Sequence, residues 1–331
     1  MKKILVSGCG SLLGQGIIKT ILSSKKNYTV FGTEYIGESV GLYWVKKGYI
    51  LPDILKKKVS INNWYLKLLK IIKQHKINYL IPGLDFELPI FCKLKSKIEK
   101  NSNCKIIISN KKIINICKDK WKTVEFLRKN NFVYPRSCLP KNLKFFLKKN
   151  KFPLIVKPRV GSTSRNVFLV KNRKELKSAL QKCSKPIIQE YLFKNNNEYT
   201  CGVIFDPDKN ICLSSIVLNR KLKNGNTIKA TLIKDEKSKK INKFIINVTK
   251  KIRPLGPLNF QLCLTKKGPT IFEINPRFSG TTPLRNIFGL NEIQVLLNSL
   301  ENKRLNKIQL KTGTIYRYFN DYFLKKEIRY I

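Results

Sequence analysis

The stretch GPLNFQLCLTKKGPTIFEINPR, residues 256–277, decides how the C-terminal part of this chain folds. Two apolar runs, 258–264 and 270–275, flank the turn-like segment 265–269, and this pattern predicts an antiparallel hairpin. If Gln261 pairs with Glu273, the alternation of side chains places Gln261, Glu273 and Asn275 on one face. The other face is apolar and is expected to pack on the core; its residues are Phe260, Leu262, Phe272 and Ile274.

The polar face of this hairpin offers only oxygen ligands, with no His or Cys. Such a set suits Mg²⁺ or Mn²⁺, which keeps several waters and takes its remaining ligands from phosphates. Arg277 stands two residues after Asn275, where a cation can hold a transferring phosphate or the acyl phosphate made from it. We therefore expect Gln261, Glu273 and Asn275 to bind a metal and Arg277 to be catalytic. An ordinary sheet edge with a solvated Glu and Asn is the structural alternative.

Length and composition narrow the class of protein. A chain of 331 residues is long enough for two or three domains. No run approaches the roughly 18 apolar residues that a membrane span needs, so we expect a soluble, cytoplasmic protein without a membrane partner. The nine cysteines are scattered and contain no C-x-x-C pair, which argues for reduced, mostly buried thiols. With His75 as the single histidine, expected at the surface, a mechanism based on a His base is disfavoured.

The formal net charge of +47 raises the alternative of a basic, non-catalytic nucleic-acid-binding protein. Lysine is spread along nearly the whole chain, however, and no Arg cluster with interleaved aromatic residues is present. We therefore expect no specific nucleic-acid partner. The milder consequence is a surface that attracts anionic substrates.

The N-terminal third alternates strand and helix patterns. Strands are predicted at 3–7, 28–33, 78–82 and 105–109, and helices at 15–24 and 64–75, an order that indicates a doubly wound parallel sheet. The Gly-rich turn 8–14 raises a second alternative, an NAD(P)-dependent oxidoreductase. Leu13 stands where the dinucleotide fingerprint needs its third glycine, which counts against that alternative.

Three further segments carry chemistry that suits phosphate and carboxylate groups. Lys157 ends an apolar strand stopped by Pro158, so the strand would hold its ammonium as a point charge for phosphate. The small-residue loop 159–166 follows, and its backbone N–H groups could cradle phosphate at Ser162, Thr163 and Ser164. A second small-residue loop, 276–285, runs into a helix and could bind an anion; its candidates for holding a carboxylate substrate are Ser279, Gly280, Thr281 and Arg285.

On these motifs the chain resembles the ATP-grasp superfamily, in particular members built like one half of a carbamoyl-phosphate synthetase large subunit. The resemblance implies that Lys120 and Lys157 reach the nucleotide phosphates. It further implies that Glu190, Tyr191 and Leu192 form the interlobe hinge that pairs with adenine, that Glu198 accepts from the ribose hydroxyls, and that Lys229 lies near the reacting phosphate. In the N-terminal domain it places Gly10, Ser11 and Glu34 in a cleft on the acceptor-substrate side.

The resemblance also implies an architecture and an activity. We expect an α/β protein with a doubly wound parallel-sheet domain at 1–109, an ATP-grasp small lobe at 110–192 and a large lobe with the metal site at 193–331. The activity implied is an ATP-dependent carboxylate–amine ligase that works through an acyl phosphate with ATP and Mg²⁺ or Mn²⁺. Its partners would be a small-molecule carboxylate and an amine, and a homodimer is compatible with this interpretation. The residues leave open which acid and amine react, and whether the product is an amide or a carbamoyl compound.

Overall fold

The N-terminal part of the chain is a parallel sheet with helices on both faces. The structure, a computed structural model, describes residues 1–24, 26, 28–161, 166–193 and 197–324. The strand order is β3-β2-β1-β4-β5 with every pair parallel, as predicted. The elements in chain order are β1 (Lys2–Ser7), α1 (Leu12–Leu22), β2 (Tyr28–Glu34), the short 3-10 helix η1 (Val40–Leu42), β3 (Lys47–Ile50), α2 (Ile61–His75), β4 (Tyr79–Ile81), α3 (Leu88–Asn101) and β5 (Lys105–Ile106).

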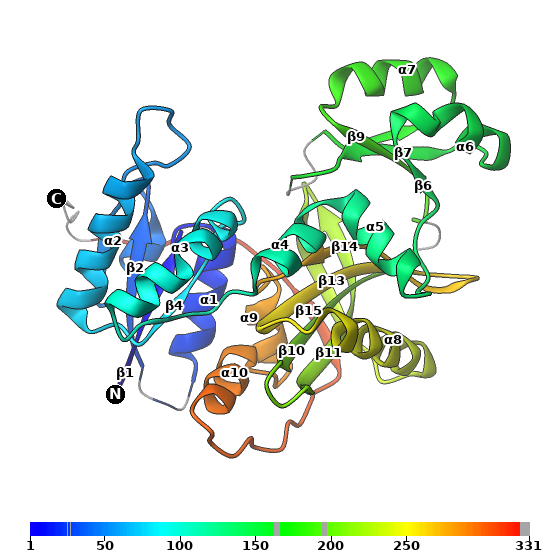
Figure 1. Cartoon of the computed structure of the whole chain (residues 1–331). Coiled ribbons are helices and arrows are strands. Elements are labelled where there is room, and N and C mark those ends of the chain that lie inside the picture. Colours follow the sequence, from blue (N-terminus) through cyan, green and yellow to red (C-terminus); the bar gives the residue numbers. More distant parts are fainter. Residues whose placement is uncertain (25, 27, 162–165, 194–196, 325–331) are drawn as a thin grey trace.

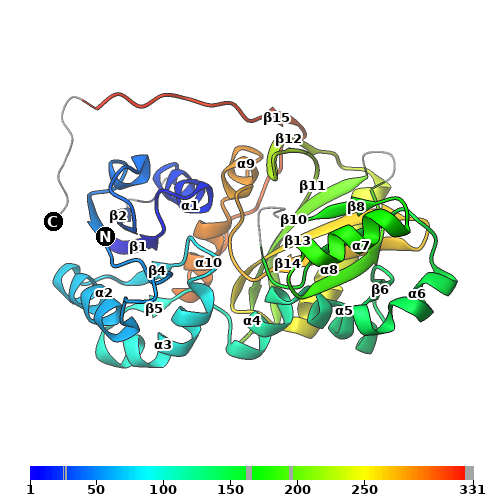
Figure 2. The same ribbon diagram turned by 90° about the horizontal axis from the view of Figure 1, so that it is seen from above.

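Two apolar cores lie on the two faces of this sheet. Side chains of α2 and α3, such as Trp64 and Phe91, pack on one face. Side chains of α1, such as Ile17 and Ile18, pack on the other, and their core continues into the C-terminal part of the chain. Figures 1 and 2 show α1 beside the two C-terminal helices α9 (Thr282–Ile287) and α10 (Glu292–Leu300). This shared core fixes the parallel sheet against the sheet that carries the metal-ligand candidates.

A second unit forms the small lobe. Two helices, α4 (Lys111–Lys118) and α5 (Lys120–Lys129), lead from β5 to a four-stranded antiparallel sheet of order β6-β9-β7-β8. Figure 1 shows this sheet with α6 and α7 at the end of the molecule far from β1. Its elements are β6 (Ser137–Cys138), the 3-10 helix η2 (Pro140–Asn142), α6 (Leu143–Lys149), β7 (Leu154–Pro158), β8 (Phe168–Val170), α7 (Arg173–Lys182) and β9 (Pro186–Glu190).

The third unit is a six-stranded antiparallel sheet of order β14-β13-β10-β11-β12-β15. Helices α4, α5 and α8 contribute to the core on one face, and α9 and α10 contribute to the core on the other. Its remaining elements are β10 (Glu198–Asp206), β11 (Ile211–Lys223), β12 (Asn226–Leu232), α8 (Glu236–Ile252), β13 (Gly256–Thr265), β14 (Gly268–Asn275) and β15 (Gly313–Tyr316). The three sheets fall within the ranges 1–109, 110–192 and 193–331, whose boundaries stay predictions.

Two local details differ from the sequence expectation. The first helix begins at Leu12 and not near residue 15, because the Ser11 hydroxyl accepts a hydrogen bond from Gly14 N at 2.9 Å and caps the helix there. His75 is half-buried and not a surface residue: its ring stacks on Phe31 with centroids 4.4 Å apart and bonds to the Tyr49 hydroxyl.

All nine cysteines are free, and seven are buried, as expected. In the part of the chain that the structure describes, no helix is long and apolar enough to cross a membrane.

Candidate active site

The hairpin β13–β14 brings the three proposed metal ligands together. Gln261 pairs with Glu273 across the hairpin, which confirms the predicted register at this point. Oε1 of Glu273 lies 3.0 Å from Nδ2 of Asn275 and 3.5 Å from Nε2 of Gln261, so both amides donate to the same carboxylate. The three oxygen-bearing head groups therefore form one cluster on one face of the sheet.

The predicted alternation fails at Phe272. The register shifts after Gln261, so that Leu262 pairs with Ile271 and Phe272 is the extra residue of a bulge. Ile271 takes the core position in place of Phe272. The Phe272 ring turns to the polar face, where its centroid lies 5.3 Å from Nζ of Lys157. The expectation that Phe272 belongs to the apolar face was wrong, because a bulge leaves no mark on the sequence pattern.

The donor set of this cluster fits Mg²⁺ or Mn²⁺. It combines one carboxylate with two amide oxygens, the hard donors that these ions prefer. Among the described residues Glu273 has no salt-bridge partner, so its charge is available to a cation. Gln261 Oε1 accepts a hydrogen bond from Nη2 of Arg220 at 2.8 Å. A cation bound through this oxygen would compete with Arg220.

Two lysines approach the hairpin from the small lobe. Lys120 begins α5 and Lys157 lies on β7, and each side chain is buried. Nζ of Lys120 donates to the carbonyl oxygen of Gly161 at 2.9 Å. Burial, together with the neighbouring charge of Lys120, lowers the pKa of Lys157 to about 7, although Glu273 counteracts part of the shift. Two buried cations beside one carboxylate are an arrangement that suits a metal-bound polyphosphate.

These groups surround the junction of two cavities. A cavity of about 110 Å³ lies beside Lys157, and one of about 500 Å³ extends toward the N-terminal sheet. The residues that line both are Lys120, Gly161, Arg220, Gln261 and Glu273. The predicted phosphate contacts Ser162, Thr163 and Ser164 lie outside the described residues and stay predictions.

The predicted hinge follows β9. The backbone N–H of Glu190 donates to Arg136 O, and its carboxylate accepts from Arg136 N and Nε, each at 2.8 Å. The Glu190 side chain is therefore held by Arg136 and not free for a ligand. Tyr191 contacts Phe193, whose ring packs edge-on against Phe272. Leu192 is half-buried beside them.

Glu198 has a partner that the sequence reasoning did not find. Its carboxylate accepts hydrogen bonds from Nε and Nη2 of Arg220, the Nε contact at 2.9 Å. Because Arg220 also reaches Gln261, it connects the proposed ribose-binding residue to the metal cluster. Strand alternation could have identified this contact. Leu218 and Arg220 share one face of β11, and an arginine on that face of a central strand lies beside the neighbouring hairpin.

Lys229 is not brought to the site. A bulge between Lys221 and Leu222 pairs Leu222 with Thr227, so residue 228 is extra in β12. Thr227 consequently lines the larger cavity, whereas Lys229 lies opposite Lys221 on the other face with Nζ 5.3 Å from the Tyr316 ring centroid. The position that the resemblance implied for Lys229 is not found, because the bulge turns this side chain to the other face of the sheet.

Arg277 lines the larger cavity and connects it to the N-terminal domain. Its Nε and Nη2 lie 2.6 and 2.9 Å from the two carboxylate oxygens of Asp85, and Nη1 donates to Phe278 O at 2.9 Å. Asp85 follows β4 and also lines the cavity. Sequence reasoning gave Asp85 no role, because 192 positions separate the two partners.

The substrate loop meets the same cavity. Ser279, Gly280 and Thr281 all line it, together with Ser11 from the N-terminal turn. Gly10 and Glu34 are not among its lining residues. Instead the Glu34 carboxylate accepts from Gly10 N at 2.7 Å, so this pair shapes the turn that presents Ser11.

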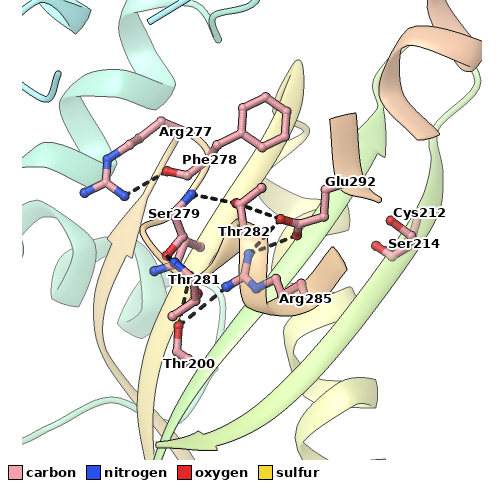
Figure 3. Close-up of polar contacts among 11 residues, drawn as sticks. Thr200, Cys212, Ser214, Arg277, Phe278, Ser279, Thr281, Thr282, Arg285 and Glu292 are labelled. Atoms are coloured by element: carbon pink, nitrogen blue, oxygen red, sulfur yellow. Dashed lines mark hydrogen bonds and ion pairs between the residues drawn. The ribbon is translucent and has the colours of Figure 1, made fainter. Parts of the chain in front are cut away.

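Arg285 is part of the core and does not face the cavity. It is 1% exposed and pairs with Glu292, also 1% exposed, at 2.9 Å. Figure 3 shows Arg285 between Glu292 and Thr200, with Thr282 completing the network. A Cβ on Gly202 would lie 2.1 Å from Glu292 Oε1, so only glycine fits beside this ion pair. The expectation that Arg285 holds the substrate was wrong, because a buried partner on the next helix neutralises it.

The chain belongs to the ATP-grasp family. The model of the ATP-grasp domain matches residues 117–281, the segment that contains both lysines, the hinge and the metal-ligand cluster. The recognised family and the α/β fold are thereby confirmed.

The particular relatives are ligases. The chain is 21% identical over 332 residues to the carbamoyl phosphate synthase large chain of Pseudothermotoga lettingae, covering 94% of this chain and 29% of the relative. It is 33% identical over 89 residues to the D-alanine--D-alanine ligase of Fusobacterium nucleatum, covering 27% of this chain and 29% of the relative. The structure of N5-carboxyaminoimidazole ribonucleotide synthetase from Thermotoga maritima superposes with a TM-score of 0.68 at 20% identity, covering 94% of this chain and 78% of that one. The chain thus spans less than a third of the length of these two sequence relatives.

Proposed function

We propose that this protein is an ATP-dependent carboxylate–amine ligase that releases ADP and phosphate. The observation that carries the proposal is the junction of the two cavities, where Lys120, Gln261 and Glu273 are shared lining residues and Lys157 lies beside them. A terminal phosphate at this junction would have cations on one side and the metal-ligand cluster on the other. A second substrate would approach it from the larger cavity.

In the first step a substrate carboxylate in the larger cavity is phosphorylated. Its oxygen attacks the γ-phosphorus of ATP, and the bond from that phosphorus to the oxygen of ADP breaks. Lys157 and Lys120 would hold the phosphates, and Arg277, which lines the larger cavity, would stabilise the charge that develops on the transferred group. Mg²⁺ or Mn²⁺ held by Gln261, Glu273 and Asn275 would neutralise charge on the terminal phosphates.

In the second step an amine attacks the acyl carbon and phosphate leaves with the carboxylate oxygen that formed the bond to phosphorus. The proton lost by the amine is taken up by phosphate or water. Ser279, Gly280 and Thr281 would hold the carboxylate substrate, and Ser11 lines the same cavity. Neither step needs a histidine, which agrees with the position of His75 at the end of α2, in the parallel-sheet domain.

The nucleotide base would bind between the small and the large lobe. The backbone of Glu190 to Leu192 is proposed to pair with the adenine edge, and the Arg136–Glu190 contacts would hold that backbone in place. Glu198 would accept from the ribose hydroxyls, in exchange for part of its pairing with Arg220. A cytoplasmic location and a homodimeric assembly belong to the same proposal.

Isotope transfer tests the mechanism directly. When the reacting acid carries ¹⁸O in its carboxyl group, one labelled oxygen is expected in inorganic phosphate, and ADP is expected to accumulate. Screening pools of carboxylates and amines for ADP release would identify the acid to be labelled. AMP with pyrophosphate would indicate adenylation, and unlabelled phosphate would indicate hydrolysis of ATP; either result contradicts the ligase.

None of the relatives reported above is an oxidoreductase or a nucleic-acid-binding protein, so nothing supports those alternatives.

A further inference from the structure

A larger cavity lies next to the one that holds the substrate loop. It has a volume of about 1460 Å³ and is bounded by α1, by residues 37–44, by the turn between β11 and β12 and by residues 317–324. Leu12, Asn226 and Arg317 line both cavities, so the two adjoin each other. The volume exceeds the roughly 300–1,000 Å³ of most small-molecule sites. A small amine such as ammonia would not need such a space.

The outer wall of this cavity is the segment 317–324, which we call the C-terminal strap. Figure 2 shows the chain running from β15 across α9 and α1 to the N-terminal domain. The strap is held near both ends: Arg317 N donates to Ile228 O at 2.8 Å, and the ring of Tyr322 packs edge-on against that of Trp44, with centroids 6.3 Å apart. Between these contacts Tyr318 is 80% exposed. The strap thus bridges the large lobe and the parallel-sheet domain.

The wall carries three kinds of side chain. Its aromatic rings are those of Tyr43, Trp44, Tyr318, Phe319 and Tyr322. Its cations are Lys19, Lys223 and Arg317, and its carboxylates are Glu38 and Asp321. Rings of this kind favour a ligand with a planar apolar body, while charges of both signs favour a ligand that carries an acidic group and an ammonium.

Arg317 ties this cavity to the reaction site. Its guanidinium Nη2 donates to the carbonyl oxygen of Gly280, in the middle of the loop proposed to hold the carboxylate substrate. A ligand whose acidic group binds Arg317 would therefore place its other end close to that loop. It would approach the acyl carbon from the side of the N-terminal domain, whereas ATP lies on the side of the small lobe.

We propose that the cavity under the C-terminal strap binds the amine acceptor of the ligase, and that this acceptor has an aromatic body and an acidic group. Arg317 positions its acidic group. That the ligand is the amine acceptor depends on the proposed function. The chemistry of the ligand is inferred from the side chains of the cavity alone.

Binding can be measured without ATP through the fluorescence of Trp44. The chain has three tryptophans, and of these Trp44 lines the cavity, whereas Trp64 is fully buried under α3. We expect saturable quenching by L-phenylalanyl-L-aspartate and none by glycylglycine or ammonium at the same concentrations. Trp44→Phe should abolish the signal, which assigns it to this residue.

Three variants separate the cavity from general effects on the fold. Arg317→Ala is expected to weaken binding of L-phenylalanyl-L-aspartate by at least about tenfold, the worth of one charge-assisted contact, and Arg317→Lys should recover part of the loss. Gly37→Leu is expected to weaken binding by filling the cavity, because a Cβ there has no heavy atom within 4 Å and the fold has room for it. The control, Arg304→Ala, changes an exposed arginine elsewhere in the C-terminal region and should bind as the parent does.

The outcomes are distinct. No saturable quenching by the aromatic dipeptide, or equal binding by the parent, Arg317→Ala and Gly37→Leu, overturns the proposal. Equal quenching by 3-phenylpropionyl-L-aspartate, which lacks the amine, would show that the cavity takes an acid and not the acceptor. If labelled phosphate forms but Trp44 does not respond, the ligase stands and this site is wrong. If Trp44 responds but no acid is phosphorylated, the cavity binds its ligand and the ligase is wrong.

Discussion

Arg277 and Asp85 join the β13–β14 hairpin to the parallel-sheet domain through two parallel hydrogen bonds of 2.6 and 2.9 Å. The guanidinium is mostly buried, with 13% of its side chain exposed, and the charge of Asp85 raises its pKa despite burial. A fork of this geometry fixes the plane of the guanidinium as well as its position. The third nitrogen, Nη1, donates to Phe278 O, so the orientation of Arg277 depends on both domains.

Asp85→Asn should therefore slow phosphoryl transfer more than it weakens ATP binding. The amide keeps the shape but removes the charge, so Arg277 loses its fixed orientation while Lys120 and Lys157 are untouched. We expect kcat to fall by about tenfold and the Kd for ATP to stay within about twofold. Asp208→Asn, on an exposed turn, is the matched control. Full additivity of Asp85→Asn with Arg277→Ala would contradict the coupling.

Glu273→Gln should abolish turnover and leave the fold intact. The carboxylate is the single charged ligand in the proposed metal cluster, and a neutral amide cannot balance a divalent cation. ADP release under saturating substrates should fall by at least about a hundredfold, with an unchanged thermal transition. A folded Glu273→Gln protein with normal turnover would remove the assignment.

Lys157→Ala should weaken ATP binding by at least about tenfold, because the ammonium is buried where phosphate is proposed to bind. Lys240→Ala removes an exposed lysine on α8 and serves as the control for the general charge of the protein. Calorimetric titration with ATP and Mg²⁺ measures both. Equal affinities of the two variants would place the phosphate site elsewhere.

Glu292→Gln should destabilise the protein while sparing the affinity for the carboxylate substrate. Loss of one partner leaves the guanidinium of Arg285 buried without its counter-charge, which costs about 3 kcal/mol of unfolding free energy. Urea unfolding gives that quantity, and the KM of the remaining folded enzyme reports on the substrate. A raised KM with unchanged stability would restore the substrate role that the sequence suggested for Arg285.

The parallel sheet and the Gln261–Glu273 pairing could be predicted because both follow from local periodicity along the chain. The positions of Phe272 and Lys229 could not, since a single bulge reverses the face of a side chain and has no signature in the residues around it. The roles of Asp85 and Arg285 depend on partners that only tertiary packing supplies.

The bulge that turns Phe272 toward Lys157 adds to the burial that lowers the pKa of this lysine, so we expect nucleotide binding to be coupled to proton uptake. With its pKa lowered to about 7, Lys157 is expected to be partly neutral in the free protein at neutral pH. A bound triphosphate favours the ammonium, so the protein takes up a fraction of a proton with each ATP, and a larger fraction toward about pH 9. The apparent affinity should then decrease with rising pH by up to about tenfold per unit. The measured heat of binding should follow the ionisation enthalpy of the buffer, and Lys157→Ala should remove that dependence.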